Sequence, residues 1–377
     1  MKISIYSYIN SVVSSALLFT CIYLFRRKFR FTHTKEISMF LFLYVIGVIR
    51  LLSPFDFFFA QGIPVENWYA SVFELLFIKD FLFFPFPVSA LIFLIFTSVS
   101  LLKLWKLFYI YKIESKYWKS EIPLESESLS AVNSAIQEQF SVPRCEVIKS
   151  ASTSVPLVTG IWKKKVIVSD ITYSYEELYY ILLHEYTHIR HGDLWKKLLA
   201  EIFYAVFWYI PFSRFIKKDF IQTLEIRCDT AVLRNRTREE KLTYMNLLIK
   251  TMKNPSTKQP VQESLFFAIQ EKETSMIERF QLMAKPPKSE KKQRYLSYFS
   301  IILVLFLFIC SYMAAPVPHY EPEYHNTETD YLLTPDMAHI IYENGSYYVI
   351  IPSKGEKNEI SPAGAQLMME NGFSLKK

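Results

Sequence analysis

Apolar residues in this chain gather in four long runs separated by polar sequence. Each run holds about 20 residues, the length that a helix needs to cross the hydrocarbon core of a membrane. The runs occupy residues 3–25, 37–57, 81–102 and 295–314. The second run is the weakest because it contains Arg50 and Pro54, and Arg50 lies near its end, where a long side chain can reach the lipid headgroups. The pattern therefore predicts four transmembrane helices.

Prolines modify the third run. Pro85 and Pro87 lie in its first third. Because proline lacks a backbone N–H and clashes with the preceding turn, we expect the helix there to be kinked or to start late.

Basic residues mark one end of three of the four runs. Arg26-Arg27-Lys28-Phe29-Arg30 follows the first run; further basic residues follow the third run and precede the fourth, namely Lys103, Lys106, Lys112, Lys291, Lys292 and Arg294. Cytoplasmic ends of spans are enriched in Lys and Arg. We therefore expect both termini outside and the segment between the third and fourth spans in the cytoplasm. A cleaved signal peptide is the alternative for the first run, but its charge follows the apolar stretch and no small-residue cleavage site stands out.

These boundaries predict a layout of five parts. They are three spans in 1–103 with an outside loop at 58–79, a cytoplasmic domain at 104–251, a cytoplasmic linker at 252–294, the fourth span at 295–314 and a small outside domain at 315–377. In the cytoplasmic domain, 128–140 has a helical pattern and 155–169 reads as two short strands joined by a turn. In the last part, 340–351 predicts a hairpin around Asn344-Gly345, followed by a short helix from Pro362 to Met369 capped by Ser361.

A further apolar stretch at 198–212 is too short for a fifth span. A crossing here would also put residue 225 on the opposite side of the membrane from residues 184–188, with which it forms one predicted site. We therefore expect an interfacial or re-entrant helix that holds the domain against the inner leaflet.

Helical spacing places two histidines on one face within the cytoplasmic domain. An uninterrupted helical pattern runs from Glu176 to His191 and puts His184 and His188 one turn apart, where two imidazoles can bind one zinc ion. Glu185 stands between them, and a carboxylate beside a metal can take a proton from water and pass it to a leaving amine. The spacing predicts a zinc peptidase with Glu185 as its base. The alternative is an amphipathic helix with surface histidines.

A zinc peptidase needs a third protein ligand, usually from a second helix. Glu225 and Asp229 share one face of a predicted helix at 224–233. We predict Glu225 as the third ligand and Asp229 as the residue that holds a ligand histidine through its outer N–H. A pair of solvated surface carboxylates is the alternative.

Three other residues compete for the ligand role. His191 is only three residues past His188, which crowds the geometry, and Glu201 lies in the apolar stretch. Cys228 faces about a quarter turn away from Asp229, which is typical of a small buried apolar residue.

At these residues the chain resembles the BlaR/MecR-type membrane-embedded metallopeptidases, the antirepressor and signal-transducing zinc proteases of Gram-positive bacteria. The resemblance covers most of residues 1–315. It is carried by His184-Glu185-x-x-His188, Asp193, Trp208-x-x-Pro211-Phe212 and Glu225-x-x-Cys228-Asp229-x-x-Val232-Leu233. It implies that His184, His188 and Glu225 bind Zn²⁺, that Glu185 is the base and that Asp229 supports the ligands. The fold class expected is a mainly α polytopic membrane protein of the bacterial cell membrane, with an α+β zincin (gluzincin-like) domain between spans 3 and 4.

The resemblance also implies a signalling role. An external cue would act through the spans, and a cytoplasmic transcriptional repressor or other regulator would be cut as the protein substrate. Self-cleavage before the last span accompanies activation in such proteins, so the apolar island at 265–269 is a candidate cut region; an apolar patch that docks on the domain is the alternative. A homodimer is left open.

One departure from the family is large. Its well-known members end in an extracellular penicillin-binding domain, whereas only about 60 residues follow the fourth run. Ser374-Leu-Lys-Lys377 matches a Ser-x-x-Lys motif by chance, and we predict no covalent β-lactam binding.

Composition agrees with a membrane protein that has no direct nucleic-acid partner. Half of the residues are hydrophobic, at 51%, and the net charge is +7. Since the positive charge gathers at the inner ends of the spans, anionic lipid explains it better than nucleic acid. The four cysteines are Cys21 and Cys310 in spans and Cys145 and Cys228 in the cytoplasmic domain, which excludes an extracellular disulfide framework.

Two other functions remain open. The first is a quality-control protease like the HtpX and CAAX-prenyl-protease group, which shares the His-Glu-x-x-His and later Glu-x-x-x-Asp pattern. The outside tail argues mildly against it. The second is a receptor whose zinc site is structural only, and Glu185 argues against that because a structural site has no use for a base.

Overall fold

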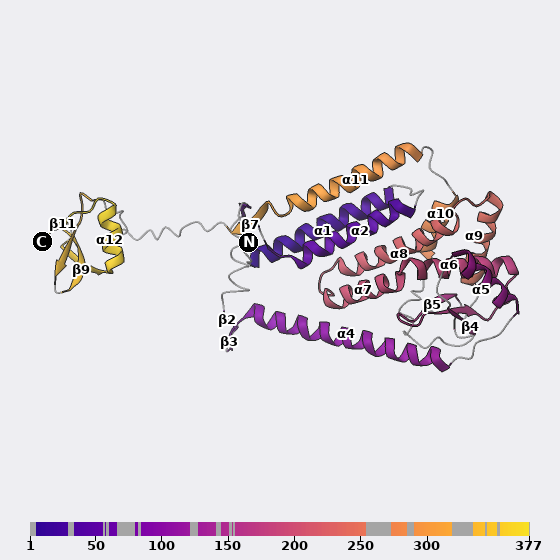
Figure 1. The fold of residues 1–377 in the computed structure, drawn as a ribbon. Helices are drawn as coiled ribbons and strands as arrows, with labels where there is room; N and C mark the ends of the chain where they lie inside the picture. The colour runs from indigo at the N-terminus through magenta and orange to yellow at the C-terminus, as the bar shows by residue number, and fades with distance from the viewer. Residues whose placement is uncertain are drawn as a thin grey trace. The chain divides into compact units, whose positions relative to one another are not determined.

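The computed structural model describes residues 5–28, 34–55, 57, 60–65, 80–81, 84–120, 127–140, 145–150, 153, 155–253, 273–284, 290–318, 335–343, 345–352 and 355–376. They form two compact units, Met1–His319 and Tyr320–Lys377. The first unit is mostly helical, so the mainly α class is confirmed (Figure 1). The candidate cut region at 265–269 and most of the predicted loop at 58–79 lie outside the described residues.

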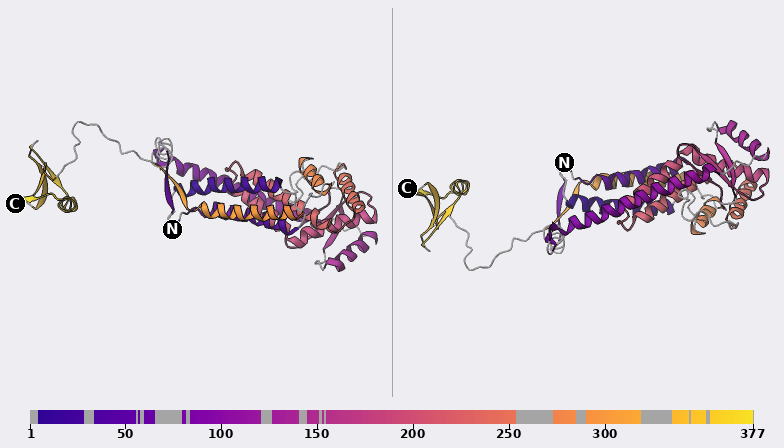
Figure 2. Two further views of the ribbon diagram at one scale, coloured as in Figure 1. Left: turned by 90° about the horizontal axis from the view of Figure 1, so that it is seen from above. Right: turned by 90° about the horizontal axis from the view of Figure 1, so that it is seen from below.

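Four long helices of the first unit coincide with the four apolar runs. They are α1 (Ile5–Lys28), α2 (Thr34–Leu52), α4 (Val88–Ser120) and α11 (Glu290–Cys310). The helices α1, α2 and α11 lie side by side around a shared apolar core, as all three views show (Figures 1 and 2). Among the helices that the structure describes, two are long and apolar enough to cross a membrane, Ser7–Lys28 and Val88–Trp118, and the apolar part of α11 is shorter, Arg294–Cys310.

The prolines of the third run delay its helix. Two short strands, β2 (Asp80–Phe81) and β3 (Phe84–Pro87), pair antiparallel before the helix, and α4 begins only at Val88. The late start agrees with the prediction made from Pro85 and Pro87.

Arg50 is buried rather than extended toward headgroups, so that expectation was wrong. Its side chain donates to Oγ of Ser311 at 2.8 Å and to the backbone oxygen of Ser53 at 3.0 Å, and its guanidinium lies 4.1 Å from the ring centroid of Tyr312. A charge inside a helix bundle is tolerated when it is hydrogen-bonded, and the residues that follow α2 and α11 supply the partners here. Arg50 therefore joins the end of α2 to the end of α11.

The apolar stretch after the motif helix forms one arm of a helical hairpin. Its helix is α7 (Asp193–Val206), followed by α8 (Ser213–Val232). The predicted bounds of 198–212 were wrong, because the helix starts directly after Gly192 and ends before the turn that contains Pro211. The hairpin packs between α4 on one side and α2 on the other (Figure 1). At its tip, Tyr209 stacks on Phe96 of α4 with centroids 4.5 Å apart.

In the described residues, the motif helix is one of four helices grouped with a small sheet. The sheet has the order β4-β6-β5, with β4 (Glu146–Ser150) parallel to β6 (Lys165–Ser169) and β5 (Leu157–Thr159) antiparallel to β6. The two strands predicted in 155–169 are confirmed; β4 was not predicted. The helices are α5 (Glu127–Phe140), α6 (Tyr175–His191), α9 (Arg238–Lys253) and α10 (Glu273–Ala284). Their shared core buries one face of α6 against α5 and the sheet.

The helix α4 reaches this sheet directly. Glu114, in its last turns and only 3% exposed, accepts a hydrogen bond of 2.8 Å from Oγ1 of Thr159 in β5. The same helix that crosses the first unit therefore contacts an edge strand beside α6.

Outside this core, a parallel strand pair joins β1 (Gln61–Val65) to β7 (Ala314–Pro318). The second unit contains a four-stranded sheet of order β10-β9-β8-β11 and one helix, α12 (Pro362–Glu370). The predicted hairpin is confirmed by antiparallel pairing of β8 (His339–Glu343) with β9 (Ser346–Ile351), and Gly345 in its turn has φ of 87°. The other strands are β10 (Glu356–Ile360) and β11 (Leu375–Lys376). The Oγ atom of Ser361 accepts the N–H of Gly364, as expected of a helix cap.

Candidate metal centre

The helix α6 carries the His-Glu-x-x-His sequence and has strong signals at both ends. Ser174 and Glu177 form a reciprocal capping box at its start, and Gly192 ends it in the left-handed conformation with φ of 66°. Because these local signals fix the helix between Tyr175 and His191, the two histidines are held one turn apart on a rigid element.

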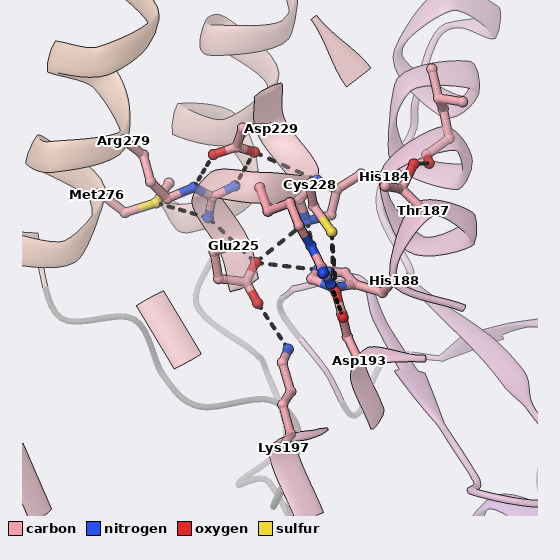
Figure 3. A network of polar contacts seen from close by, with 12 residues as sticks. His184, Thr187, His188, Asp193, Lys197, Glu225, Cys228, Asp229, Met276 and Arg279 are labelled. Atoms are coloured by element: carbon pink, nitrogen blue, oxygen red, sulfur yellow. Dashed lines mark hydrogen bonds and ion pairs between the residues drawn. The ribbon is translucent and has the colours of Figure 1, made fainter. Parts of the chain in front are cut away.

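Three side chains from α6 and α8 converge on one point (Figure 3). The Nε2 atoms of His184 and His188 are 3.1 Å apart. The Oε2 atom of Glu225 lies 3.5 Å from Nε2 of His184 and 3.3 Å from Nε2 of His188. In a tetrahedral zinc site with bonds of 2.0–2.2 Å, ligand atoms lie about 3.4 Å apart. The three atoms therefore have the spacing and the donor chemistry that suit a zinc ion.

The outer nitrogen of His188 is held by Asp193. Its Nδ1 donates to Oδ2 of Asp193 at 2.9 Å, and Asp193 is itself bound by Arg227 and, at 3.3 Å, by Lys196. The hydrogen bond from His188 and the positive charge of Arg227 outweigh burial and hold the pKa of Asp193 far below its usual range. An ionised carboxylate on Nδ1 leaves the lone pair of Nε2 for a metal.

The outer nitrogen of His184 is held through a tyrosine. Tyr244 of α9 donates to Oδ1 of Asp229 at 2.7 Å, so its hydroxyl oxygen accepts from Nδ1 of His184 at 2.9 Å. The direct distance from that Nδ1 to Asp229 is longer, at 3.5 Å. Asp229 thus reaches the histidine mainly by way of Tyr244.

Asp229 in turn is clamped by Arg279 of α10. The guanidinium donates to Oδ2 at 2.5 Å and to Oδ1 at 2.6 Å, and both side chains are 4% exposed. The Nη1 atom of Arg279 also lies 3.9 Å from the Oε2 atom of Glu225. The preceding residue, Glu278, faces the other way and accepts a hydrogen bond of 2.7 Å from Arg26 at the end of α1.

The second oxygen of Glu225 is paired with a lysine. Lys197 of α7 donates to Oε1 at 2.8 Å. Burial by itself would lower the pKa of Lys197, but the attraction of Glu225 outweighs it and raises that pKa. The same pairing, with His188, outweighs burial of Glu225 and lowers the pKa of its carboxyl well below the usual range. Glu225 therefore stays ionised and offers Oε2 to the histidines.

Glu185 follows His184 on α6 and is 7% exposed. Glu225 and, to a smaller extent, Asp193 and Glu185 raise the pKa of Lys197 on α7.

The three competitors lie differently. Cys228 contacts Nδ1 of His188 at 3.2 Å rather than Nε2, and burial raises the pKa of its thiol to about 12, so it stays protonated. Burial and the nearby charge of Arg227 lower the pKa of His191 to about 4. Glu201 pairs with Lys217 at 3.0 Å. A second group, His188, Asp193 and Cys228, is close-packed, but Asp193 is already neutralised by Arg227, so this group supports His188.

Several residues of this network were not predicted. Lys197, Tyr244 and Arg279 come from three other helices, and Asp193 had been noted only as part of the family pattern. Asp193 could have been predicted from the sequence, because the side chain of a carboxylate residue just after the motif helix can reach a group in the last turn of that helix. A single lysine, tyrosine or arginine far along the chain carries no such signal.

Comparison with known proteins identifies a family and several relatives. The family described as BlaR1 peptidase M56 matches residues 80–283, more than half of the chain. The chain is 24% identical over 221 residues to the regulatory protein BlaR1 of Staphylococcus aureus, covering 56% of this chain and 36% of that protein. It is 27% identical over 132 residues to the methicillin resistance mecR1 protein of the same species, covering 34% of this chain and 23% of that protein. The chain thus matches only about a third or less of the length of these relatives.

Proposed function

Because the chain belongs to the BlaR1 peptidase M56 family, we propose that it is a membrane-embedded zinc endopeptidase with His184, His188 and Glu225 as metal ligands and Glu185 as general base. Membership of this family supports metallopeptidase activity in general terms. The finer assignment rests on one observation, the 3.1–3.5 Å spacing of two imidazole nitrogens and one carboxylate oxygen. The second polar atom of each of these three side chains is hydrogen-bonded to a neighbouring residue.

The chemistry follows from those neighbours. When bound, the zinc ion supplies Lewis acidity for a scissile carbonyl and for water. Glu185 takes the proton of the attacking water and passes it to the nitrogen of the leaving amine. Asp193 and Tyr244 keep the ligand imidazoles in the tautomer with a free Nε2, and Lys197 keeps Glu225 ionised.

We place the substrate along β5. Within the described residues this strand pairs in the sheet only with β6, so its second edge has no strand partner, and β5 contacts α6. A peptide bound as an extra strand would present its backbone in extended form beside the motif helix.

The membrane arrangement proposed is four spans, α1, α2, α4 and α11, with both termini outside the cell and the metal centre in the cytoplasm. The ends of α1 and α11 that lie near α8 and α10 carry the basic residues, which favours a cytoplasmic position for that side. The biological role proposed is signalling by cleavage of a cytoplasmic regulator, such as a transcriptional repressor, and of the chain itself. The relatives that support this role bear the names methicillin resistance protein and regulatory protein.

The test is proteolysis by the full chain in reconstituted membranes. Wild type is compared with Glu185→Gln at equal bound zinc, with unfolded casein as substrate. We expect casein cleavage to fall by at least about 100-fold, as for loss of a general base. Glu176→Gln, an exposed glutamate in the first turn of α6, is the matched control and should cleave normally. Cleavage that survives in Glu185→Gln would contradict the proposal.

The same samples test self-cleavage. Intact-mass measurement should show fragments of the chain in wild type and only full-length protein in Glu185→Gln. Equal fragments in both would exclude self-cleavage by this centre.

A further inference from the structure

A cavity of about 330 Å³ lies beside the end of α8, between helices that are far apart in sequence. Lys35 comes from the first turn of α2, Arg234 from the end of α8 and Arg294 from the start of α11. The remaining lining residues are Thr34, Glu36, Thr230 and Tyr298. Three cations and one carboxylate therefore face a single cavity, and none of its lining residues belongs to the metal centre.

The positive charge in this cavity is only partly compensated. Glu36, 3% exposed, lies 3.9 Å from Arg294. Within the described part of the chain, neither Lys35 nor Arg234 forms an ion pair with a carboxylate. A cavity with two such cations and a helix start, whose first backbone N–H groups lack partners inside the helix, attracts a compact anion.

The faces of α2 and α11 that lead away from the cavity are apolar and exposed. On α2, Met39 and Phe42 follow Lys35 at intervals of one and two turns and are 37% and 60% exposed. On α11, Ile302 follows Tyr298 by one turn and is 65% exposed. The two helices pack against each other. A ligand that fits both features has a charged head in the cavity and apolar chains along the helices.

We infer that this cavity binds the headgroup of an anionic phospholipid, with its acyl chains along α2 and α11. The inference rests on the proposed position of α2 and α11 in the membrane, whose cytoplasmic leaflet is the anionic one. It does not rest on peptidase activity. A soluble phosphate would use the same cations, but it would gain nothing from the exposed Met39, Phe42 and Ile302.

The position of this lipid bears on the metal centre. Thr230, which lines the cavity, follows Asp229, the residue clamped by Arg279. A headgroup held by α2, α8 and α11 would therefore fix the end of the helix that also carries Glu225. Binding at this site would make the metal centre sensitive to the lipid composition of the inner leaflet.

The experiment measures lipid binding by native mass spectrometry of the full chain, in the Glu185→Gln background so that self-cleavage cannot interfere. The probes are dioleoyl phosphatidylglycerol, dioleoyl phosphatidylcholine and inorganic phosphate. The variant Lys35→Gln with Arg234→Gln removes two cavity cations. Its control, Arg27→Gln with Lys28→Gln, removes two exposed cations from the end of α1 on the same side of the bundle.

We expect the protein with all cavity cations to bind phosphatidylglycerol more tightly than phosphatidylcholine. The cavity variant should lose about 20-fold in phosphatidylglycerol affinity, whereas the control variant should lose less than about threefold. Equal losses in both variants would mean general surface attraction and would overturn the inference. Displacement of phosphatidylglycerol by millimolar inorganic phosphate would assign the cavity to a soluble anion and would overturn it too. Bound zinc, measured on each sample, shows that the variants are folded.

Discussion

Lys197 donates a hydrogen bond of 2.8 Å to Oε1 of Glu225, while Oε2 of the same carboxylate faces the two histidine nitrogens. The lysine gives the two carboxylate oxygens of Glu225 different roles. One oxygen is neutralised by the ammonium group and the other is left for the metal. The carboxylate is thereby fixed in rotation as well as in charge.

Lys197→Met should weaken zinc binding about 10- to 100-fold, the usual cost of removing a group that supports a metal ligand. Methionine keeps much of the volume but leaves Oε1 of Glu225 without its partner in a buried site. The measurement is a zinc competition titration against a chelating dye. Lys218→Met, an exposed lysine on α8, is the control and should leave the affinity unchanged. Equal zinc affinity in Lys197→Met and wild type would show that the pair does not act on the ligand.

Tyr244→Phe should lower zinc affinity by about tenfold. The phenol oxygen accepts from Nδ1 of His184 and donates to Asp229, so its loss frees the imidazole to change tautomer. Tyr180→Phe is a matched control because its ring packs 5.9 Å from that of Tyr244, whereas its hydroxyl contacts Glu240 instead of a ligand. If both variants bind zinc alike, the tyrosine relay has no role in the metal centre.

The pair Arg279 and Asp229 should be a strong determinant of stability. Both side chains are 4% exposed, and removing one partner of a buried ion pair costs about 3–5 kcal/mol. We therefore expect Arg279→Met to lower the free energy of unfolding by that amount in metal-free protein. In the double variant Arg279→Met with Asp229→Asn, the loss should be smaller than the sum of the single losses, with a coupling of about 2 kcal/mol.

Denaturant unfolding in detergent measures this cycle. Arg190→Met, an exposed arginine of α6, should change the free energy of unfolding by less than about 0.5 kcal/mol. Strictly additive losses would mean that the two residues do not interact. Because Glu278, next to Arg279, holds Arg26 of α1, destabilisation of α10 should also loosen its contact with α1.

The parts of the fold that were predicted well depend on local sequence patterns. The motif helix was expected from Glu176 to His191 and runs from Tyr175 to His191, because its capping box, periodicity and final glycine all lie within the segment. The approach of Glu225 to the two histidines followed from helical spacing and a family pattern. The number of spans, their orientation and the ligand roles stay predictions.

What the sequence did not reveal depends on contacts between distant segments. Arg50 looked like a residue that reaches lipid headgroups, since nothing near it in sequence shows that Ser311 and Tyr312 lie across from it. The strand β4 went unnoticed because its five residues alternate weakly and its partner is a parallel strand about 20 residues later. In the same way, Lys197 and Arg279 acquire their roles only when their helices pack against Glu225 and Asp229.

Gly160 sets the turn between β5 and β6 and hence the position of the proposed substrate edge. Its φ is +79°, and a Cβ atom there would lie 2.1 Å from the backbone oxygen of Lys163. Gly192 also has positive φ, +66°, but a Cβ atom there meets nothing within 4 Å. Gly192→Ala should therefore cost only the backbone strain of about 1 kcal/mol. Gly160→Ala should cost at least about 2 kcal/mol more, because backbone atoms must move apart to accommodate the methyl group.

Denaturant unfolding of the two variants side by side measures the difference, and casein cleavage should fall more in Gly160→Ala if β5 holds the substrate. Equal stability losses would show that the turn does not have this close approach, whereas a stability loss with unchanged cleavage would move the substrate away from β5.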